Sequence, residues 1–286
     1  MKKLIDEILD EVFPTDITEI INQQEHLGMR LSGGIDSAFL CFLLMTKFPN
    51  KKIIPITMYN KIRPAAVDSV NRVKEVLKIL NPDSILMEPE IGYFDTSGFE
   101  PTQEQRDNFI ATGEKYNPKD IFQNRWFNEL LDKYEGKLNM FISGETLNPP
   151  LDVQAELCHI RGEFPPDRNI KASRIFTSWN YNEFTRYEFR PFRNTNKKEL
   201  ASWVKQLGLM KTLFPITETC EMETIHYDMY SKRFNIKYKH PGIEPCRRCW
   251  PCREKWWAYG YYDFMTEEEE GTLVKGKNQN AGDYGQ

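Results

Sequence analysis

The segment Leu31–Ser37, which reads LSGGIDS, constrains this chain more than any other part of its sequence. It separates a short strand-like segment, residues 26–31, from an apolar helix-forming run that starts at Ala38. Two adjacent glycines place no Cβ in the way of an approaching anion. The first turn of the helix that follows presents N–H groups and a partial positive charge, and Ser32 and Ser37 add hydroxyl groups. The segment therefore predicts a loop that binds phosphate or pyrophosphate.

Two other kinds of phosphate-binding loop do not fit this sequence. Loops of kinases and GTPases end in Gly-Lys-Ser/Thr, with the lysine on the terminal phosphates. No lysine follows Gly34 in that pattern, and the dinucleotide fingerprint G-x-G-x-x-G is also missing.

The Ser-Gly-Gly-x-Asp-Ser pattern resembles the fingerprint of the ATP pyrophosphatase (PP-loop) superfamily, whose members cleave ATP between its α and β phosphates. The resemblance implies ATP and Mg²⁺ as cofactors. Asp36 would orient the loop or help to hold Mg²⁺; the alternative is a carboxylate that caps the helix. Ser32, Asp36 and Ser37 are the candidate catalytic residues. The candidate nucleotide-binding residues of the loop are Leu31, Ser32, Gly33, Gly34, Ile35, Asp36 and Ser37.

Strand and helix patterns alternate along most of the chain. Residues 1–20 are typical of one amphipathic helix. Asn196 and Glu199 form a capping-box pattern for a helix that Gly208 ends. Further strands are predicted at 53–59, 85–87, 138–142 and 186–190, and further helices at 67–80 and 119–135. This alternation predicts an α/β fold with a doubly wound parallel sheet. The resemblance to the PP-loop superfamily implies that this sheet is adenine nucleotide alpha hydrolase-like.

Ligands of such sheets bind at the carboxyl ends of the strands. Both the 31–37 segment and Ser143-Gly144-Glu145 follow predicted strands. We therefore expect Gly144 and Glu145 to line the same nucleotide site. Lys61 and Arg63 are candidates for contact with phosphate or carboxylate, or else solvated surface charges.

Four of the six cysteines lie in the last quarter of the chain. Cys246, Cys249 and Cys252 are spaced by two residues each, and zinc takes four ligands of this kind in a tetrahedron. Cys220 is the expected fourth ligand, with His226 and His240 as alternatives, and an iron–sulfur cluster is the alternative to Zn²⁺. Cys41 lies in the apolar helix and is expected in the core.

The predicted organisation has three parts. Residues 1–210 form the ATP-binding domain, with irregular insertions at about 92–135 and 151–185. Residues 211–262 form a C-terminal helical zinc-knuckle region, and residues 263–286 form a disordered tail. No apolar run is long enough for a membrane span, and residues 1–13 are too acidic for a signal peptide, so we expect a cytoplasmic protein. The net charge of −4 does not favour nucleic acid, and a homo-oligomer is left open.

The loop and the cysteine cluster together resemble the 7-cyano-7-deazaguanine synthase family, which has both. Arg190–Phe192, Asn196–Leu200, Leu207–Leu209, Thr217–Cys220 and Cys246–Glu254 also resemble segments of that family. The resemblance implies a ligase of queuosine biosynthesis that adenylates a 7-carboxy-7-deazaguanine-type carboxylate. Ammonia then converts the acyl adenylate to an amide, and a second activation gives a nitrile. The implied partners are this deazapurine carboxylate and ammonia, and the implied metals are Mg²⁺ and Zn²⁺.

Two departures from the family weaken the assignment of the acceptor. Cys220 and Cys246 are separated by 25 residues, more than the family has, and the family's Tyr-Pro-Asp-Cys-Arg stretch is represented only by Pro150–Asp152.

Other functions stay open at this point. Basic and aromatic residues are mixed over 230–257. Such a mixture can bind single-stranded RNA, as in a tRNA-base-modifying enzyme that acts through thiolation or lysine addition. The alternative is a basic rim around an anionic metal knuckle. A sulfonucleotide reductase is disfavoured because its reactive cysteine should stand alone. A non-catalytic nucleotide-binding module with a zinc knuckle is the third alternative, and AMP release separates it from the enzymes.

Overall fold

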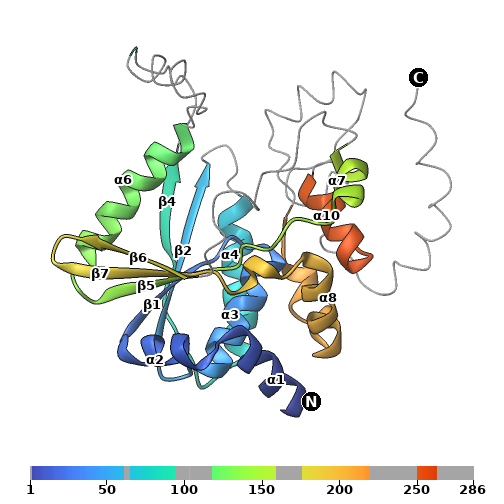
Figure 1. Cartoon of the computed structure of the whole chain (residues 1–286), viewed down its shortest axis with the longest axis horizontal. Coiled ribbons are helices and arrows are strands. Elements are labelled where there is room, and N and C mark those ends of the chain that lie inside the picture. The colour runs from blue at the N-terminus through green and yellow to red at the C-terminus, as the bar shows by residue number, and fades with distance from the viewer. Residues whose placement is uncertain are drawn as a thin grey trace.

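A computed structural model describes residues 2–60, 65–94, 103, 118–158, 176–219 and 250–262. Its centre is a seven-stranded sheet with the order β3-β2-β1-β5-β7-β6, in which β4 also pairs with β2 (Figure 1). All pairs are parallel except β6 with β7. The strands are β1 His26–Arg30, β2 Lys52–Asn60, β3 Ile85–Leu86, β4 Glu90–Phe94, β5 Leu138–Ser143, β6 Phe176–Tyr181 and β7 Phe184–Phe189.

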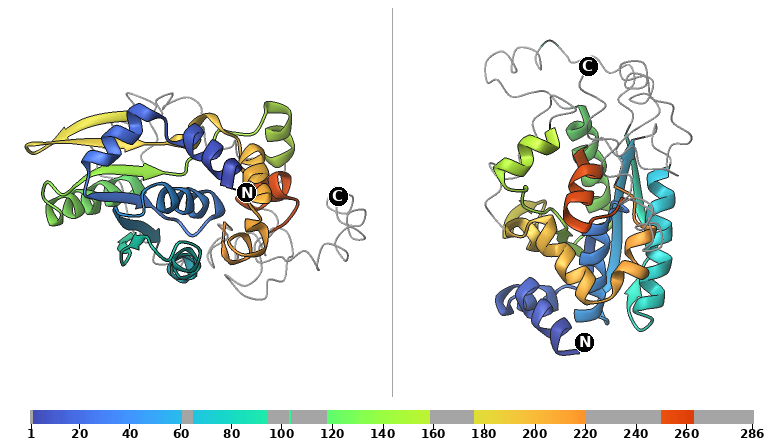
Figure 2. Two further views of the ribbon diagram at one scale, coloured as in Figure 1. Left: turned by 90° about the horizontal axis from the view of Figure 1, so that it is seen from below. Right: turned by 90° about the vertical axis from the view of Figure 1, so that its right-hand side faces the viewer.

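Helices cover both faces of this sheet (Figure 2). The larger core joins α1–α4 and α8 to one face, and the smaller core joins α6 to the other. The helices are α1 Lys2–Val12, α2 Thr15–Gln23, α3 Ile35–Lys47, α4 Ala65–Leu80, α6 Pro118–Lys133, α7 Leu151–Cys158, α8 Lys197–Gln206 and α10 Trp250–Tyr259, with short 3-10 turns η1 Pro191–Asn194, η2 Leu209–Lys211 and η3 Phe214–Ile216.

Close packing around β1 fixes where the loop after it lies. Leu27 and Met29 are fully buried against the large core. Gly28 faces the other way, and a Cβ there would lie 2.8 Å from the side chains of Ile56 on β2 and Phe141 on β5, which fill the space beside this glycine. Buried Phe39 of α3 stacks on Phe192, which holds the helix after the loop against η1.

The mixed α/β fold with a mainly parallel sheet agrees with the prediction from sequence, and three local predictions need correction. Residues 1–20 form two helices rather than one, since Pro14 lies between α1 and α2 and cannot continue a helix. The sheet is not wholly parallel, because β6 and β7 form a hairpin around Asn182, whose φ is +53°. The segments expected to be irregular contain regular elements: the end of β4 lies within 92–135, and α7 and β6 lie within 151–185, while α6 agrees with the helix predicted at 119–135.

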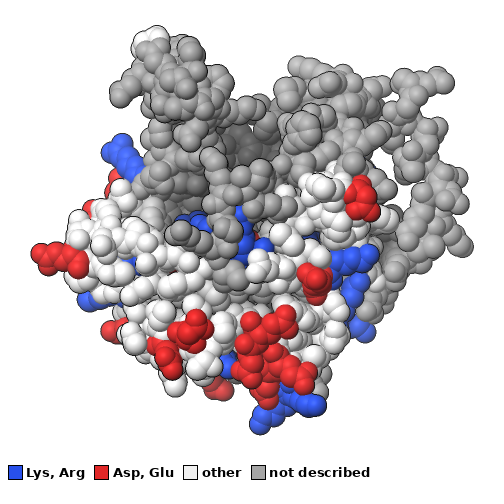
Figure 3. Space-filling view, viewed as in Figure 1, with Lys and Arg blue, Asp and Glu red and all other residues white. Residues whose placement is uncertain are grey.

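Acidic side chains gather over α1 and α2 on the lower side of the molecule (Figure 3). The exposed residues there are Asp6, Glu7, Asp10, Glu11, Asp16 and Glu19. This surface repels anions, so a negatively charged ligand has to approach elsewhere. Among the described residues, no helix has the length and apolar character needed to cross a membrane.

Candidate nucleotide-binding site

The loop between β1 and α3 adopts a conformation that depends on its two glycines. Gly33 has φ +82°, in the left-handed region that other residues rarely adopt, and a Cβ there would lie 2.7 Å from the Cβ of Ser69. Gly34 is the N-cap residue of α3, and no side chain caps this helix. The positive end of α3 therefore lies at the carboxyl end of β1, where it favours an anion.

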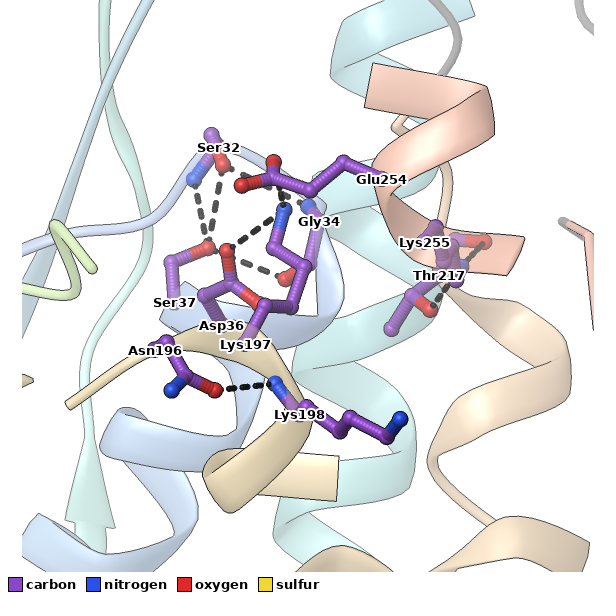
Figure 4. Close-up of polar contacts among 10 residues, drawn as sticks. All are labelled: Ser32, Gly34, Asp36, Ser37, Asn196, Lys197, Lys198, Thr217, Glu254 and Lys255. Carbon is purple, nitrogen blue, oxygen red and sulfur yellow. Dashed lines mark hydrogen bonds and ion pairs between the residues drawn. The ribbon is translucent and has the colours of Figure 1, made fainter. Parts of the chain in front are cut away.

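The two serines of the loop are placed differently. Ser37 is buried, and its Oγ accepts from the Ser32 N–H at 3.1 Å and donates to the Gly34 carbonyl at 3.1 Å (Figure 4). The Ser32 Oγ lies 3.0 Å from the Ser37 Oγ, but Ser32 is exposed. Ser37 thus closes the loop on itself, and Ser32 is the hydroxyl that a ligand can reach.

Asp36 forms an ion pair with a lysine far along the chain. The Lys197 Nζ lies 3.1 Å from the Asp36 Oδ2 and 2.9 Å from Glu254 Oε2 (Figure 4). Lys197 and Glu254 are 4% and 1% exposed, so the three charges form one nearly dry cluster beside the loop. The alternative role of Asp36 as the helix cap is wrong, because Gly34 holds that position.

A capping box determines where Lys197 lies. The Asn196 side chain accepts from the N–H groups of Lys198 and Glu199, and the Glu199 carboxylate accepts from the Asn196 N–H, as the sequence predicts. Helix α8 therefore begins at Lys197, whose side chain extends toward the loop while Lys198 points away from it (Figure 4).

Helix α10 brings the second carboxylate of this cluster. Its residue Lys255 is fully buried and donates to the Thr217 Oγ1 at 3.0 Å, which anchors the helix next to Glu254. Burial raises the pKa of Tyr259 far above its usual range, and the charges of Asp36 and Glu254 raise it further. Tyr259 is therefore a neutral phenol beside the cluster.

The two strand ends predicted to share a site do meet. A Cβ at Gly144 would lie 3.0 Å from the carbonyl carbon and oxygen of Asp36, so the segment after β5 lies against the start of α3. The Glu145 carboxylate lies 3.3 Å from the Arg193 Nη1 and 3.6 Å from the Arg190 Nε.

A third segment, just before Cys220, also contacts the loop. The Glu218 N–H donates to the Gly33 carbonyl at 2.9 Å, and the Glu218 Oε2 accepts from Ser69 at 2.6 Å. Thr219 lies beside Gly34, since a Cβ at Gly34 would be 3.1 Å from the Thr219 Cγ2.

Sequence reasoning missed Lys197, Glu218 and Glu254 as members of the site. Lys197 and Glu218 do lie in segments that resemble the synthase family, which was the available signal. Glu254 is the last residue of the resembling segment Cys246–Glu254, but its pairing with Lys197, 57 residues away, has no local signal.

The donor groups fit Mg²⁺ at the loop. This ion is usually held by one or two carboxylates together with substrate phosphates, and the partly exposed carboxylate of Asp36 lies at the loop. Mg²⁺ there would neutralise charge on the phosphates. In the ranges that the structure covers, no group of three or more His, Cys, Asp or Glu side chains is arranged to hold a metal.

Of the predicted metal ligands, the structure describes only Cys252, which is buried near the start of α10. Cys220, Cys246, Cys249, His226 and His240 lie outside the described residues, as do Lys61 and Arg63. Cys41 lies in the core as predicted, and burial raises its pKa to about 12.

No protein-family model matches this chain. No curated protein matches it either. Among solved structures, the chain is similar to the U34-tRNA thiolase NcsA from Methanococcus maripaludis with its [4Fe-4S] cluster, at 16% identity over 96% of this chain and 81% of that one, with a TM-score of 0.44. It is also similar to an NH3-dependent NAD synthetase from Campylobacter jejuni, at 17% identity over 82% and 84%, with a TM-score of 0.39. An NMN synthetase from Francisella tularensis matches at 13% identity over 91% and 92%, with a TM-score of 0.37. Similarities at this level do not define a function.

Proposed function

We propose that this chain is an ATP-dependent adenylating enzyme of the PP-loop type, which cleaves ATP to AMP and pyrophosphate. The observation that carries this proposal is the position of the Gly33–Gly34 turn. The turn joins β1 to the uncapped end of α3, and β1 pairs with β2 on one side and β5 on the other. The strand order of the sheet reverses at β1, because β2 lies on one side of it and β5 on the other. Doubly wound sheets bind their ligands at such a point.

The loop residues supply what such a reaction needs. A carboxylate oxygen of the acceptor attacks the α-phosphorus, the bond from that phosphorus to the bridging oxygen breaks, and pyrophosphate leaves with the electron pair. Backbone N–H groups of residues 33–37 and the Ser32 hydroxyl donate hydrogen bonds to the phosphate oxygens on which charge develops.

For the acceptor, we propose a 7-carboxy-7-deazaguanine-type carboxylate. Ammonia then attacks the acyl carbon, AMP leaves, and an amide forms. A second adenylation, on the amide oxygen, followed by loss of AMP and a proton gives the nitrile. The support for this acceptor is the sequence resemblance, which includes Asn196–Leu200 and Thr217–Cys220.

We further propose that Cys220, Cys246, Cys249 and Cys252 bind a structural metal, zinc rather than an iron–sulfur cluster. The support is the x2 spacing of three thiols, because thiolates are usual ligands of structural zinc. Elemental analysis of the purified protein tests this, since zinc and iron are measured separately and a cluster also absorbs visible light.

The test of the reaction is incubation with Mg-ATP, ammonium and 7-carboxy-7-deazaguanine, followed by mass spectrometry. We expect AMP, pyrophosphate and an amide or nitrile. An Asp36→Ala variant should give none of these and still fold, as judged by circular dichroism.

Each competing function predicts a different product pattern. ADP in place of AMP would refute the proposed cleavage. AMP that forms only with tRNA would replace the proposed acceptor with a nucleic-acid base and leave the ATP chemistry standing. ATP binding without AMP release, for every acceptor, would identify a non-catalytic nucleotide-binding module.

A further inference from the structure

Five residues of alternating charge form a chain of ion pairs along the carboxyl ends of β1, β5 and β7. The Arg30 Nη2 lies 3.1 Å from the Glu188 Oε1, and the Arg190 Nη2 lies 2.5 Å from the Glu188 Oε2. Glu145 continues the chain, with Arg190 on one side and Arg193 on the other. We call this set of three arginines and two glutamates the carboxyl-edge network.

The carboxyl-edge network starts beside the nucleotide loop and leads away from it. Glu145 is the residue after Gly144, which packs against the backbone of Asp36. The other end lies on the α6 face of the sheet, since Glu188 pairs in register with Phe141 of the small core. There the Arg30 guanidinium lies 5.6 Å from the centre of the Phe127 ring. An acceptor held along this network is next to the loop that would adenylate it.

The network has a net charge of +1 and is reachable from solvent at its two exposed members. The side chains of Arg30 and Glu145 are 44% and 42% exposed, while Glu188 in the middle is 8% exposed. Stability alone is a weak reason to bury such charges, because apolar residues of similar size usually serve it as well.

Two polar atoms at the middle of the network show what it could bind. Among the described residues, neither the Glu188 Oε1 nor the Arg190 Nε makes a hydrogen bond, and both atoms are buried. The first is an acceptor and the second is a donor, and they belong to residues joined by a 2.5 Å ion pair. A ligand that complements them has an N–H next to a carbonyl, which is the edge of a cyclic amide. Arg30 is the movable partner, since its exposed side chain can leave Glu188 when the ligand's N–H arrives.

We propose that Glu188 and Arg190 bind the cyclic-amide edge of a planar heterocycle, the acceptor of the adenylation. This inference rests on the proposed function and specifies which residues recognise the acceptor. Glu188 accepts from the ring N–H, and Arg190 donates to the ring carbonyl. Buried Arg193, on the loop side of Glu145, supplies a guanidinium for the carboxylate that becomes adenylated.

The test compares binding of 7-carboxy-7-deazaguanine with that of its derivative methylated on the ring amide nitrogen, by isothermal titration calorimetry. In the wild type, methylation should weaken binding about 10- to 100-fold, the usual effect of losing a hydrogen bond to a charged group. Glu188→Gln should weaken binding of the first ligand by a similar factor and remove most of the discrimination.

Glu90→Gln is the matched control. Glu90 is also an ion-paired strand carboxylate, held by Lys133 at 2.7 Å on β4. This variant should keep wild-type affinity and discrimination. Arg190→Lys is the second site variant: it keeps the charge and removes the Nε donor, and it should also lose affinity.

The inference is overturned if Glu188→Gln, or Arg190→Lys where the first variant does not fold, behaves like Glu90→Gln toward both ligands. Failure of the proposed function gives a different result, namely no AMP from wild type with this carboxylate. In that case guanine and 1-methylguanine replace the two ligands. If the wild type binds guanine more tightly than 1-methylguanine and Glu188→Gln does not, the result still supports the site.

Discussion

Replacing Lys197 with methionine is the sharpest test of the charge cluster beside the loop. Methionine has nearly the same length as lysine and fills the same volume, but it removes the ammonium that lies between Asp36 and Glu254. The side chains of these two carboxylates are 18% and 2% exposed, so little water is available to replace the lost partner.

The expected cost follows from that burial. Removing one partner of a buried ion pair costs about 3–5 kcal/mol, because the other charge stays buried. Asp36 keeps some contact with water, so the lower half of this range, about 3–4 kcal/mol, is the better expectation for Lys197→Met. In domains of roughly this size each kcal/mol lowers the melting temperature by about 2–4 °C, which gives a loss of about 6–16 °C.

Thermal and urea unfolding measure this loss, and the next residue supplies the control. Lys198 is exposed and lies 5.4 Å from the Trp257 ring, an exposed cation–π contact worth about 0.5–1 kcal/mol. Lys198→Met should therefore cost no more than about 1 kcal/mol. Adding Glu254→Gln to Lys197→Met should restore part of the stability, as a double-mutant cycle would detect.

Two results would refute this reasoning. One is an equal loss of stability in Lys197→Met and Lys198→Met. The other is strict additivity of Lys197→Met and Glu254→Gln, because charges in one cluster have to couple.

Three further predictions concern other parts of the described structure. Gly144→Ala places a Cβ 3.0 Å from the Asp36 carbonyl and should weaken binding of a fluorescent ATP analogue; unchanged affinity would contradict the close approach. Burial lowers the pKa of His26, so the unfolded chain binds the proton more tightly, and stability is lost as pH falls below the unfolded pKa of about 6.5. Between pH 7.5 and 5.5, the free energy of unfolding measured in urea should therefore fall less for His26→Asn than for the wild type. An identical fall in both proteins would contradict a lowered pKa of His26. Because the pKa of Cys41 is raised to about 12, iodoacetamide at pH 8 should leave this thiol unlabelled until the protein is denatured, as peptide mass spectrometry can check.

What the sequence could predict depends on how local the cause is. The loop after β1 and the capping box at Asn196 are set by residues within a few positions, and both were recognised. The antiparallel edge strand was missed because pairing of β6 with β7 depends on a two-residue turn, of which Asn182 was the signal.

The partners of Asp36 could not be read from the sequence for a different reason. Lys197 comes from the start of α8 and Glu254 from α10, and only the packing of these helices beside α3 brings the three charges together. The family resemblance marks the segments that contain Lys197 and Glu254, but it does not show that these two side chains meet at Asp36.

This cluster also determines how the loop must meet a triphosphate. The formal charges of Asp36, Glu254 and Lys197 sum to −1. A nucleotide with several negative charges is repelled there unless a cation comes with it, so we expect ATP to bind only as its Mg²⁺ complex. Isothermal titration calorimetry of ATP, once with Mg²⁺ and once with EDTA, measures this difference in affinity. The difference should be larger in Lys197→Met, where the three side chains carry −2 in place of −1. Equal affinity for ATP in the presence of EDTA would mean that Asp36 does not face the phosphates.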